Sequence, residues 1–284
     1  MLEGVVGFPP EFARRYRERG YWAEKSLADE FKVVFERYRD RVALIDREQS
    51  ITYGSLDRLS SNLALNLLDL GLRPLERVVV QLPNVAEFVI LYFGLQKIGC
   101  IPIAALPSHR YAEISQFVKL SAATTCVTPD HQRDFDYVQM ASRLLNEIPV
   151  LKRAIILGRP HSDFASLSEL ISKPATLPAS KLLEIRINPT DPAVFQLSGG
   201  TTGIPKLIPR THNDYAYNSK AAARVCAISE ESVLLVALPI AHYRSLRRDS
   251  ARCASHPGIS CQTTPEYRAS RGYGSCVSQR DPHA

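Results

Sequence analysis

The residues best suited to chemistry lie in one short run, Ser198 to Lys206. The run contains three glycines, three hydroxyl side chains and a final lysine, and apolar segments flank it at 193–195 and 207–209. Glycine lets backbone N–H groups approach phosphate oxygens closely, hydroxyl groups add donors, and lysine adds a positive charge. The composition therefore predicts a loop that binds a polyphosphate, in an enzyme that consumes a nucleoside triphosphate.

Other interpretations of this run are weaker or remain open. A tight turn between two strands can contain the same glycines, and Lys206 can be an ordinary solvated loop lysine. The Walker A pattern G-x-x-x-x-G-K-[ST] does not fit, because Pro205 precedes the lysine and Leu207 follows it. No helix begins directly after the lysine either, so a P-loop kinase is disfavoured.

Size and composition are those of an ordinary soluble domain protein. The chain has 284 residues, of which 45% are hydrophobic and 23% charged. The longest apolar stretch, 88–95, is far shorter than the roughly 20 residues of a membrane helix, and nothing resembles a signal peptide. We expect a cytoplasmic protein with no membrane partner. No C-x-x-C pair supports zinc or thioredoxin chemistry, and Cys100 and Cys126 are expected to be buried.

The charge distribution argues against a nucleic-acid partner and marks a boundary. Of the net charge of +6, residues 243–284 contribute +4 and the rest of the chain only +2. The same 42 residues hold seven Ser, seven Arg and three Cys but no Lys or Phe. Such a segment buries too little apolar surface to offset the entropy of ordering it. We expect a folded part at 1–242 and a divergent tail at 243–284, either disordered or translated out of frame.

The elements that must position the loop are visible as alternating strand-like and helix-like segments. Leucines at 56, 59, 63, 67 and 70, for example, have helical spacing, with Ser55 as a candidate N-cap and Gly71 as a stop signal. Strands that alternate with helices of about 10–15 residues predict an α/β fold, with a mostly parallel sheet and helices on both faces. Strands are expected at 42–45, 51–53, 77–82, 101–106, 124–128, 153–157, 193–197, 207–209 and 232–238, and helices at 56–70, 87–98, 111–121, 134–146 and 213–227.

The complete motif is far more specific than its glycines. S-G-G-T-T-G-x-P-K resembles the phosphate loop of the adenylate-forming superfamily, and the extension L-I-P-R-T-H at 207–212 is similar to the stand-alone aryl-acid adenylating enzymes, the 2,3-dihydroxybenzoate–AMP ligases. The resemblance covers about residues 1–242. Further stretches that resemble that family in order and spacing are Gly20–Trp22, Val79–Asn84, Ala105–Arg110 and Ala237–His242.

This resemblance implies a fold and a reaction. The fold would be part of the large N-terminal domain of the adenylate-forming enzymes, without their small C-terminal domain. The reaction would be the ATP- and Mg²⁺-dependent activation of an aryl acid, 2,3-dihydroxybenzoate or salicylate, to an acyl-adenylate. The acyl group would then pass to the phosphopantetheine arm of an aryl carrier protein in siderophore biosynthesis.

The resemblance also implies roles for individual residues. His242 matches a histidine beside the aryl-acid and α-phosphate sites, and the preceding strand 233–238 would place it at a strand's carboxyl end, although a packed or surface histidine is an equal alternative. For Ser108–Arg110, which also follow a strand, we expect a structural role. The residues that match the phosphate-binding loop are Ser198, Gly199, Gly200, Thr201, Thr202, Gly203 and Lys206.

The departures from the family pattern begin immediately after His242. Tyr243 stands where the family has an asparagine that contacts the aryl acid, and the rest of the family's site lies beyond this point. We therefore expect an inactive fragment with no measurable adenylation by this polypeptide alone. A non-catalytic remnant that binds a nucleotide or a partner remains the alternative.

Overall fold

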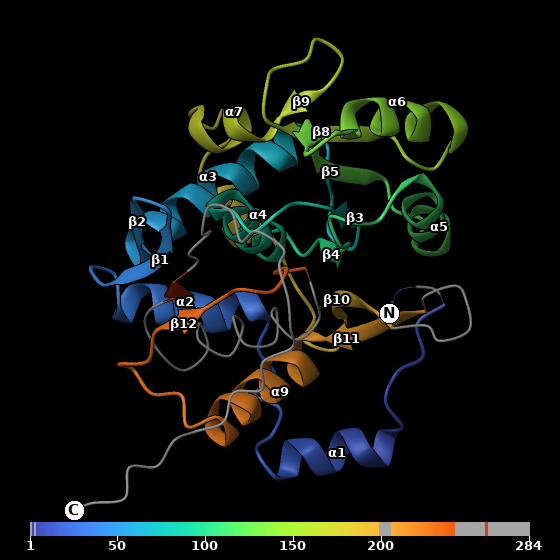
Figure 1. The fold of residues 1–284 in the computed structure, drawn as a ribbon. Helices are drawn as coiled ribbons and strands as arrows, with labels where there is room; N and C mark the ends of the chain where they lie inside the picture. Colours follow the sequence, from blue (N-terminus) through green and yellow to red (C-terminus); the bar gives the residue numbers. More distant parts are fainter. Residues whose placement is uncertain (1, 3, 199–205, 242–258, 261–284) are drawn as a thin grey trace, which may run out of the picture.

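A seven-stranded sheet is the centre of the computed structural model, which describes residues 2, 4–198, 206–241 and 259–260. All neighbouring strands run parallel except β10 and β11, which are antiparallel. This arrangement confirms the predicted mostly parallel sheet (Figure 1). In spatial order the strands are β11 (Leu207–Thr211), β10 (Pro192–Leu197), β4 (Ile101–Ala104), β3 (Arg77–Val80), β5 (Thr125–Pro129), β8 (Arg153–Leu157) and β9 (Ala165–Ser166).

Helices cover both faces of this sheet, because successive side chains of a strand point to opposite faces. In β3, Val78 and Val80 belong to one apolar core and Val79 to a second one. The first core is built with α3 (Tyr53–Asp69) and α4 (Ala86–Lys97). The second is built with α5 (Tyr111–Ser121) and α6 (Tyr137–Glu147). Valine is well suited to β3, because this strand is buried on both faces of the sheet.

Helix boundaries follow local signals, with corrections at α3 and α6. The helix α6 begins at Tyr137 and not at the predicted residue 134, because Phe135–Asp136 form a short strand and Asp136 caps the helix. The helix α5 has the predicted bounds, and α4 ends just before Gly99, whose φ of +68° favours glycine. Ser55, however, is not the N-cap of α3. Thr52 is in an extended conformation and its hydroxyl oxygen accepts a hydrogen bond from the Ser55 backbone N–H, so the helix starts three residues earlier than the apolar spacing indicates.

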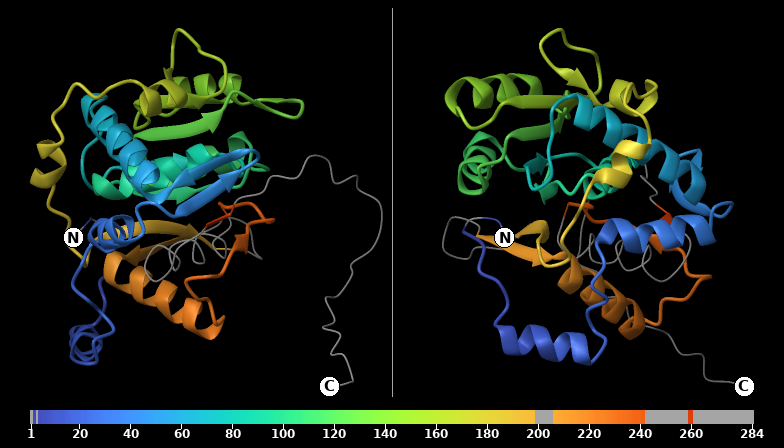
Figure 2. Two further views of the ribbon diagram at one scale, coloured as in Figure 1. Left: turned by 90° about the vertical axis from the view of Figure 1, so that its left-hand side faces the viewer. Right: turned by 180° about the vertical axis from the view of Figure 1, so that it is seen from behind.

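Two N-terminal helices and four shorter elements were not expected from the sequence. The helix α2 (Leu27–Arg37) begins with a reciprocal capping box between Ser26 and Asp29. In Figure 2, α1 (Pro10–Glu18) lies at the periphery of the molecule, beyond α9 (His212–Val225). The four shorter unexpected elements are β6 (His131–Gln132), β7 (Phe135–Asp136), α7 (Leu167–Ser172) and α8 (Ser180–Glu184). The predicted hairpin is present as β1 (Val42–Asp46) and β2 (Gln49–Thr52).

The end of the chain differs from expectation in one respect. The strand expected at 232–238 is reduced to β12 (Leu234–Leu235), which pairs in parallel with β13 (Ile259–Ser260). The other residues of 243–284 lie outside the described part, so the predicted boundary at 242 stays a prediction. Cys100 and Cys126 are buried, as expected. Across the described residues, every helix is too short or too polar to cross a membrane.

Candidate functional site

The predicted phosphate-binding loop connects β10 to β11, and hydrogen bonds close its base. Leu197 and Leu207 are paired at the ends of the two strands. The Ser198 backbone N–H donates to the Lys206 carbonyl oxygen at 2.9 Å, and the Lys206 backbone N–H donates to the Ser198 hydroxyl oxygen at 2.8 Å. Gly199, Gly200, Thr201, Thr202 and Gly203 lie outside the described residues. The structure therefore brings the two ends of the loop together.

The loop begins at the edge of the sheet where ligands usually bind. The parallel strands β10 and β4 are paired through Phe195 and Ile103, so the carboxyl ends of both strands lie at the same edge. Ser198 directly follows β10, and the loop Leu106–Arg110 follows β4. Open α/β sheets bind ligands outside the carboxyl ends of their strands.

Lys206 and Ser198 keep polar groups available for a ligand. Lys206 is exposed, and no carboxylate among the described residues pairs with it. The Ser198 hydroxyl oxygen accepts the bond from Lys206, which leaves its own O–H free to donate. One positive charge and one hydroxyl donor thus remain at the base of the loop.

A polar network holds the hairpin to the helix that follows it. The Arg210 guanidinium on β11 is paired with Asp214 on α9, and it also donates to the Gln196 side-chain oxygen on β10 at 3.2 Å. Thr211 caps α9 by accepting a bond from the Asp214 backbone N–H at 3.2 Å. The L-I-P-R-T-H extension at 207–212, which the sequence alone shows only as a family resemblance, therefore holds the base of the loop to α9. We call Arg210, Asp214 and His212 the support of the hairpin.

Two buried side chains at the start of α9 hold the N-terminal segment. The His212 Nδ1 accepts a hydrogen bond from the Leu27 backbone N–H at 3.2 Å, and the Asn213 side-chain oxygen accepts one from the Glu24 backbone N–H at 3.0 Å. Burial lowers the pKa of His212 to about 4, although the carboxylate of Asp29 acts in the opposite direction. His212 is therefore neutral near pH 7, as an acceptor at Nδ1 must be.

His242 itself lies outside the described residues, but the segment that leads to it is well anchored. The Asn84 side chain, just after β3, donates to the carbonyl oxygens of Val236 at 3.2 Å and Leu238 at 2.9 Å, and accepts from the Ile240 backbone N–H at 2.7 Å. These bonds occupy backbone groups that a longer strand would use, which explains why the predicted strand 233–238 is wrong in extent. Sequence analysis assigned no role to Asn84. The available signals were its position after a strand and a proline and its place in the family-like stretch Val79–Asn84.

The loop Leu106–Arg110 has the structural role that the sequence predicts. The His109 Nδ1 accepts a bond from the Leu106 backbone N–H at 3.1 Å, and the Tyr137 hydroxyl donates to the Pro107 carbonyl oxygen at 2.6 Å. The Gln81 side-chain amide donates to the carbonyl oxygens of Leu106 at 2.9 Å and His109 at 2.8 Å. Burial lowers the pKa of His109, so its ring is a neutral acceptor.

Comparison with known proteins identifies the family. The model of the AMP-binding enzyme family matches residues 31–253. The chain belongs to the AMP-binding enzyme family. Over 246 residues it is 42% identical to Triostin synthetase I of Streptomyces triostinicus, covering 87% of this chain and 44% of that protein. Over 242 residues it is 38% identical to the 2,3-dihydroxybenzoate-AMP ligase of Bacillus subtilis (strain 168), covering 85% of this chain and 43% of that protein.

A solved structure agrees with this assignment. The apo structure of MbtA from Mycobacterium smegmatis superposes with a TM-score of 0.82 at 37% identity, and the match covers 90% of this AMP-binding chain and 47% of the other. The fold is that of the N-terminal domain of the adenylate-forming enzymes, as predicted. The chain spans somewhat less than half the length of the relatives that it matches.

Proposed function

We propose that this chain supplies the phosphate-binding part of an aryl-acid adenylating site. The observation that carries the proposal is the closed base of the β10–β11 hairpin, which presents the family's phosphate-loop motif at the carboxyl end of β10. The groups proposed to hold the β- and γ-phosphates of ATP are Ser198, Gly199, Gly200, Thr201, Thr202, Gly203 and Lys206.

The described residues fit an anionic ligand at this position. When bound, ATP supplies the adenylyl group that turns a poor leaving group, a carboxylate oxygen, into a good one. Negative charge builds up on the two departing phosphates, and the Lys206 ammonium with the loop N–H groups is proposed to stabilise it. Arg210 and Asp214 join β11, the strand that directly follows Lys206, to α9, so the base of the loop is fixed before a ligand arrives.

The second substrate is proposed to be an aryl acid, 2,3-dihydroxybenzoate or salicylate, with Mg²⁺ as the accompanying ion. The described residues contain no cluster of His, Cys, Asp and Glu able to hold a metal, so we assign no Mg²⁺ ligand among them. His242 is proposed to lie beside the aryl acid, since Asn84 holds the preceding segment at the carboxyl end of β3. Transfer of the acyl group to an aryl carrier protein completes the proposed function.

The 284-residue polypeptide is not expected to complete adenylation alone, because it corresponds to less than half of its relatives. The alternative is a nucleotide-binding protein without catalysis. The two are separated by adding the complementary part of an aryl-acid–AMP ligase as a second polypeptide and measuring aryl-acid-dependent pyrophosphate exchange. Exchange that requires both polypeptides supports adenylation. Its absence favours the non-catalytic alternative, and exchange by this polypeptide alone contradicts the expected incompleteness.

Binding of ATP tests the loop directly, with a fluorescent ATP analogue as the probe. Lys206→Ala should weaken binding at least about tenfold, because one charge–phosphate contact is lost. Its effect on the free energy of unfolding should be within about 0.5 kcal/mol, since the side chain is exposed. Lys152→Ala, which changes an exposed lysine at the amino end of β8, is the matched control and should bind as the parent does. Equal affinity of the two variants for the ATP analogue would show that Lys206 does not contact the phosphates.

A further inference from the structure

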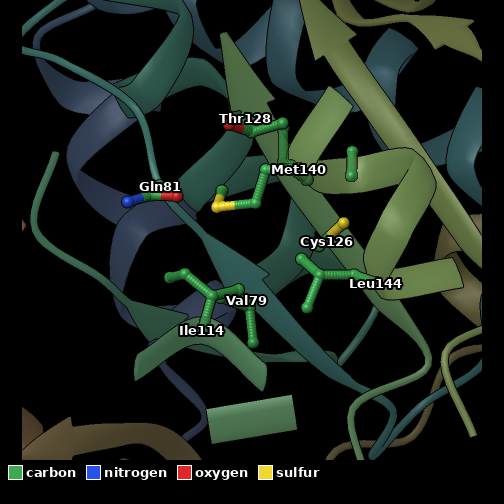
Figure 3. A pocket seen from close by; sticks show the side chains of 9 residues that line it. Val79, Gln81, Ile114, Cys126, Thr128, Met140 and Leu144 are labelled. Atoms are coloured by element: carbon green, nitrogen blue, oxygen red, sulfur yellow. The ribbon is translucent and has the colours of Figure 1, made fainter. Parts of the chain in front are cut away.

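A small cavity lies between β3, β5, α5 and α6, in the second apolar core. Its volume is about 10 Å³. A cavity needs about 10–15 Å³ to hold a single water molecule, so this one reaches the lower limit for one water. The residues that line it are Val79, Gln81, Ile114, Cys126, Val127, Thr128, Met140, Ala141 and Leu144, of which Figure 3 labels seven.

Two of these side chains bring polar atoms that lack partners. Gln81 and Thr128 are only 2% and 3% exposed. Neither the Gln81 side-chain oxygen nor the Thr128 hydroxyl has a hydrogen-bonding partner among the described residues. A buried polar atom without a partner loses its hydrogen bonds to water and gains none in return, so two of them at one cavity are costly. Native proteins commonly satisfy such groups with ordered water.

The orientation of Gln81 is determined by its other bonds. Its amide nitrogen donates to the carbonyl oxygens of Leu106 and His109, and its backbone N–H donates to the Val127 carbonyl oxygen at 2.8 Å. A flipped amide would lose both side-chain bonds, because a carbonyl oxygen cannot donate. The side-chain oxygen is therefore directed away from the loop, and in Figure 3 it points toward the Met140 side of the cavity while the nitrogen points outward.

We propose that this cavity binds one structural water molecule between Gln81 and Thr128. The Thr128 hydroxyl donates to the water, and the water donates one hydrogen to the Gln81 side-chain oxygen. Its second hydrogen faces the sulfur of Met140, a weak acceptor that also lines the cavity. Every strong donor and acceptor at the cavity then has a partner, whereas a dry cavity leaves two oxygens unpaired.

The proposed water has a consequence for the neighbouring loop. Gln81 is the side chain that connects the end of β3 to Leu106 and His109, and Thr128 lies at the end of β5. A water between them joins β5 to the loop through Gln81. This inference does not depend on the proposed function, since it concerns the interior of the second core.

The test is a crystal structure at a resolution that shows ordered water, together with thermal unfolding of the Thr128→Val variant. The expected result is one density peak within hydrogen-bonding distance of both oxygens, absent in T128V. The variant keeps the shape of threonine but removes the hydroxyl, so it should unfold about 2–4 °C earlier, as expected for one lost hydrogen bond.

Ser219→Ala is the matched control for the sign of this shift. Ser219 is 0% exposed and its hydroxyl also lacks a partner among the described residues, but it lies on α9, outside this cavity. Its removal should leave the melting temperature unchanged or raise it. A parent structure without the peak overturns the proposal, and so does a rise in the melting temperature of T128V, because removing an unpaired buried hydroxyl is stabilising.

Discussion

Two loops leave neighbouring strands of the sheet at the same edge, and they are held in different ways. The loop Leu106–Arg110 after β4 is bonded along its length, by Gln81, by Tyr137 and by its own histidine. Of the loop after β10 the structure describes the two ends, where Ser198 and Lys206 are bonded to each other. The first loop uses its polar groups to stabilise the fold, whereas the second keeps a lysine ammonium and a hydroxyl available.

This difference is the one expected between a structural loop and the proposed phosphate-binding loop. A ligand can be held only by donors that the protein has not already used, and the pairing within Leu106–Arg110 explains why it fits a structural role despite its histidine and arginine. The support of the second loop lies beneath it, in Arg210, Asp214 and His212. Substitutions in the first loop and in this support should therefore affect stability, and substitutions at the exposed end of the hairpin should affect binding.

The largest expected effect is a pH dependence at the support of the hairpin. The pKa of His212 is about 4 in the folded chain, compared with about 6.5 for an unperturbed histidine. Between these values the unfolded state binds more protons, so stability is complete above pH 6.5 and is lost as the pH falls toward 4. The loss should reach about 3 kcal/mol. Urea unfolding at a series of pH values measures it.

His212→Asn is the control for this pH effect. Asparagine places a side-chain oxygen near the position of Nδ1, where it can accept the Leu27 N–H without titrating. The variant should show a flatter profile between pH 4 and 6.5. A profile as steep as that of the parent would mean that other groups, and not the support of the hairpin, cause the acid sensitivity.

A smaller loss, about 2 kcal/mol, is expected for Gln81→Leu in the structural loop. Leucine has a similar volume but cannot donate to the Leu106 and His109 carbonyl oxygens. Thermal or urea unfolding measures the change. Gln139→Leu on α6 is the control, because Gln139 is exposed and its substitution should change stability by no more than about 0.5 kcal/mol. Equal losses in the two variants would contradict a structural role for the Gln81 amide.

The smallest effect, below about 1 kcal/mol, is expected for Ser198→Ala at the base of the hairpin. The substitution removes the acceptor of the Lys206 backbone N–H, which can bond to water instead because this end of the loop is exposed. Unfolding experiments measure the loss, and Ser198→Thr should restore the bond. A loss in Ser198→Ala as large as that in Gln81→Leu would remove the difference between the two loops.

The accuracy of the sequence predictions varied with the range of the interactions. The bounds of α5 and β8 were predicted correctly, because periodicity and turn residues are local signals. The start of α3 was misplaced because Thr52 and Ser55 are both suitable caps, and only the backbone conformation distinguishes them. The strand before His242 was predicted too long, since Asn84, some 150 residues earlier, takes its backbone partners. The roles of Gly199–Gly203 and His242 stay predictions.

The sequence alone determined the motif of the loop, the mostly parallel sheet and the family, because glycine content, side-chain types and apolar spacing are properties of neighbouring residues. Only the tertiary structure decided which polar groups are used. Gln81 reaches a carbonyl 25 residues away, and the Leu27 N–H meets a histidine 185 residues away. Such pairs form when distant segments pack and water is excluded, so their energy depends on burial, which no local pattern specifies.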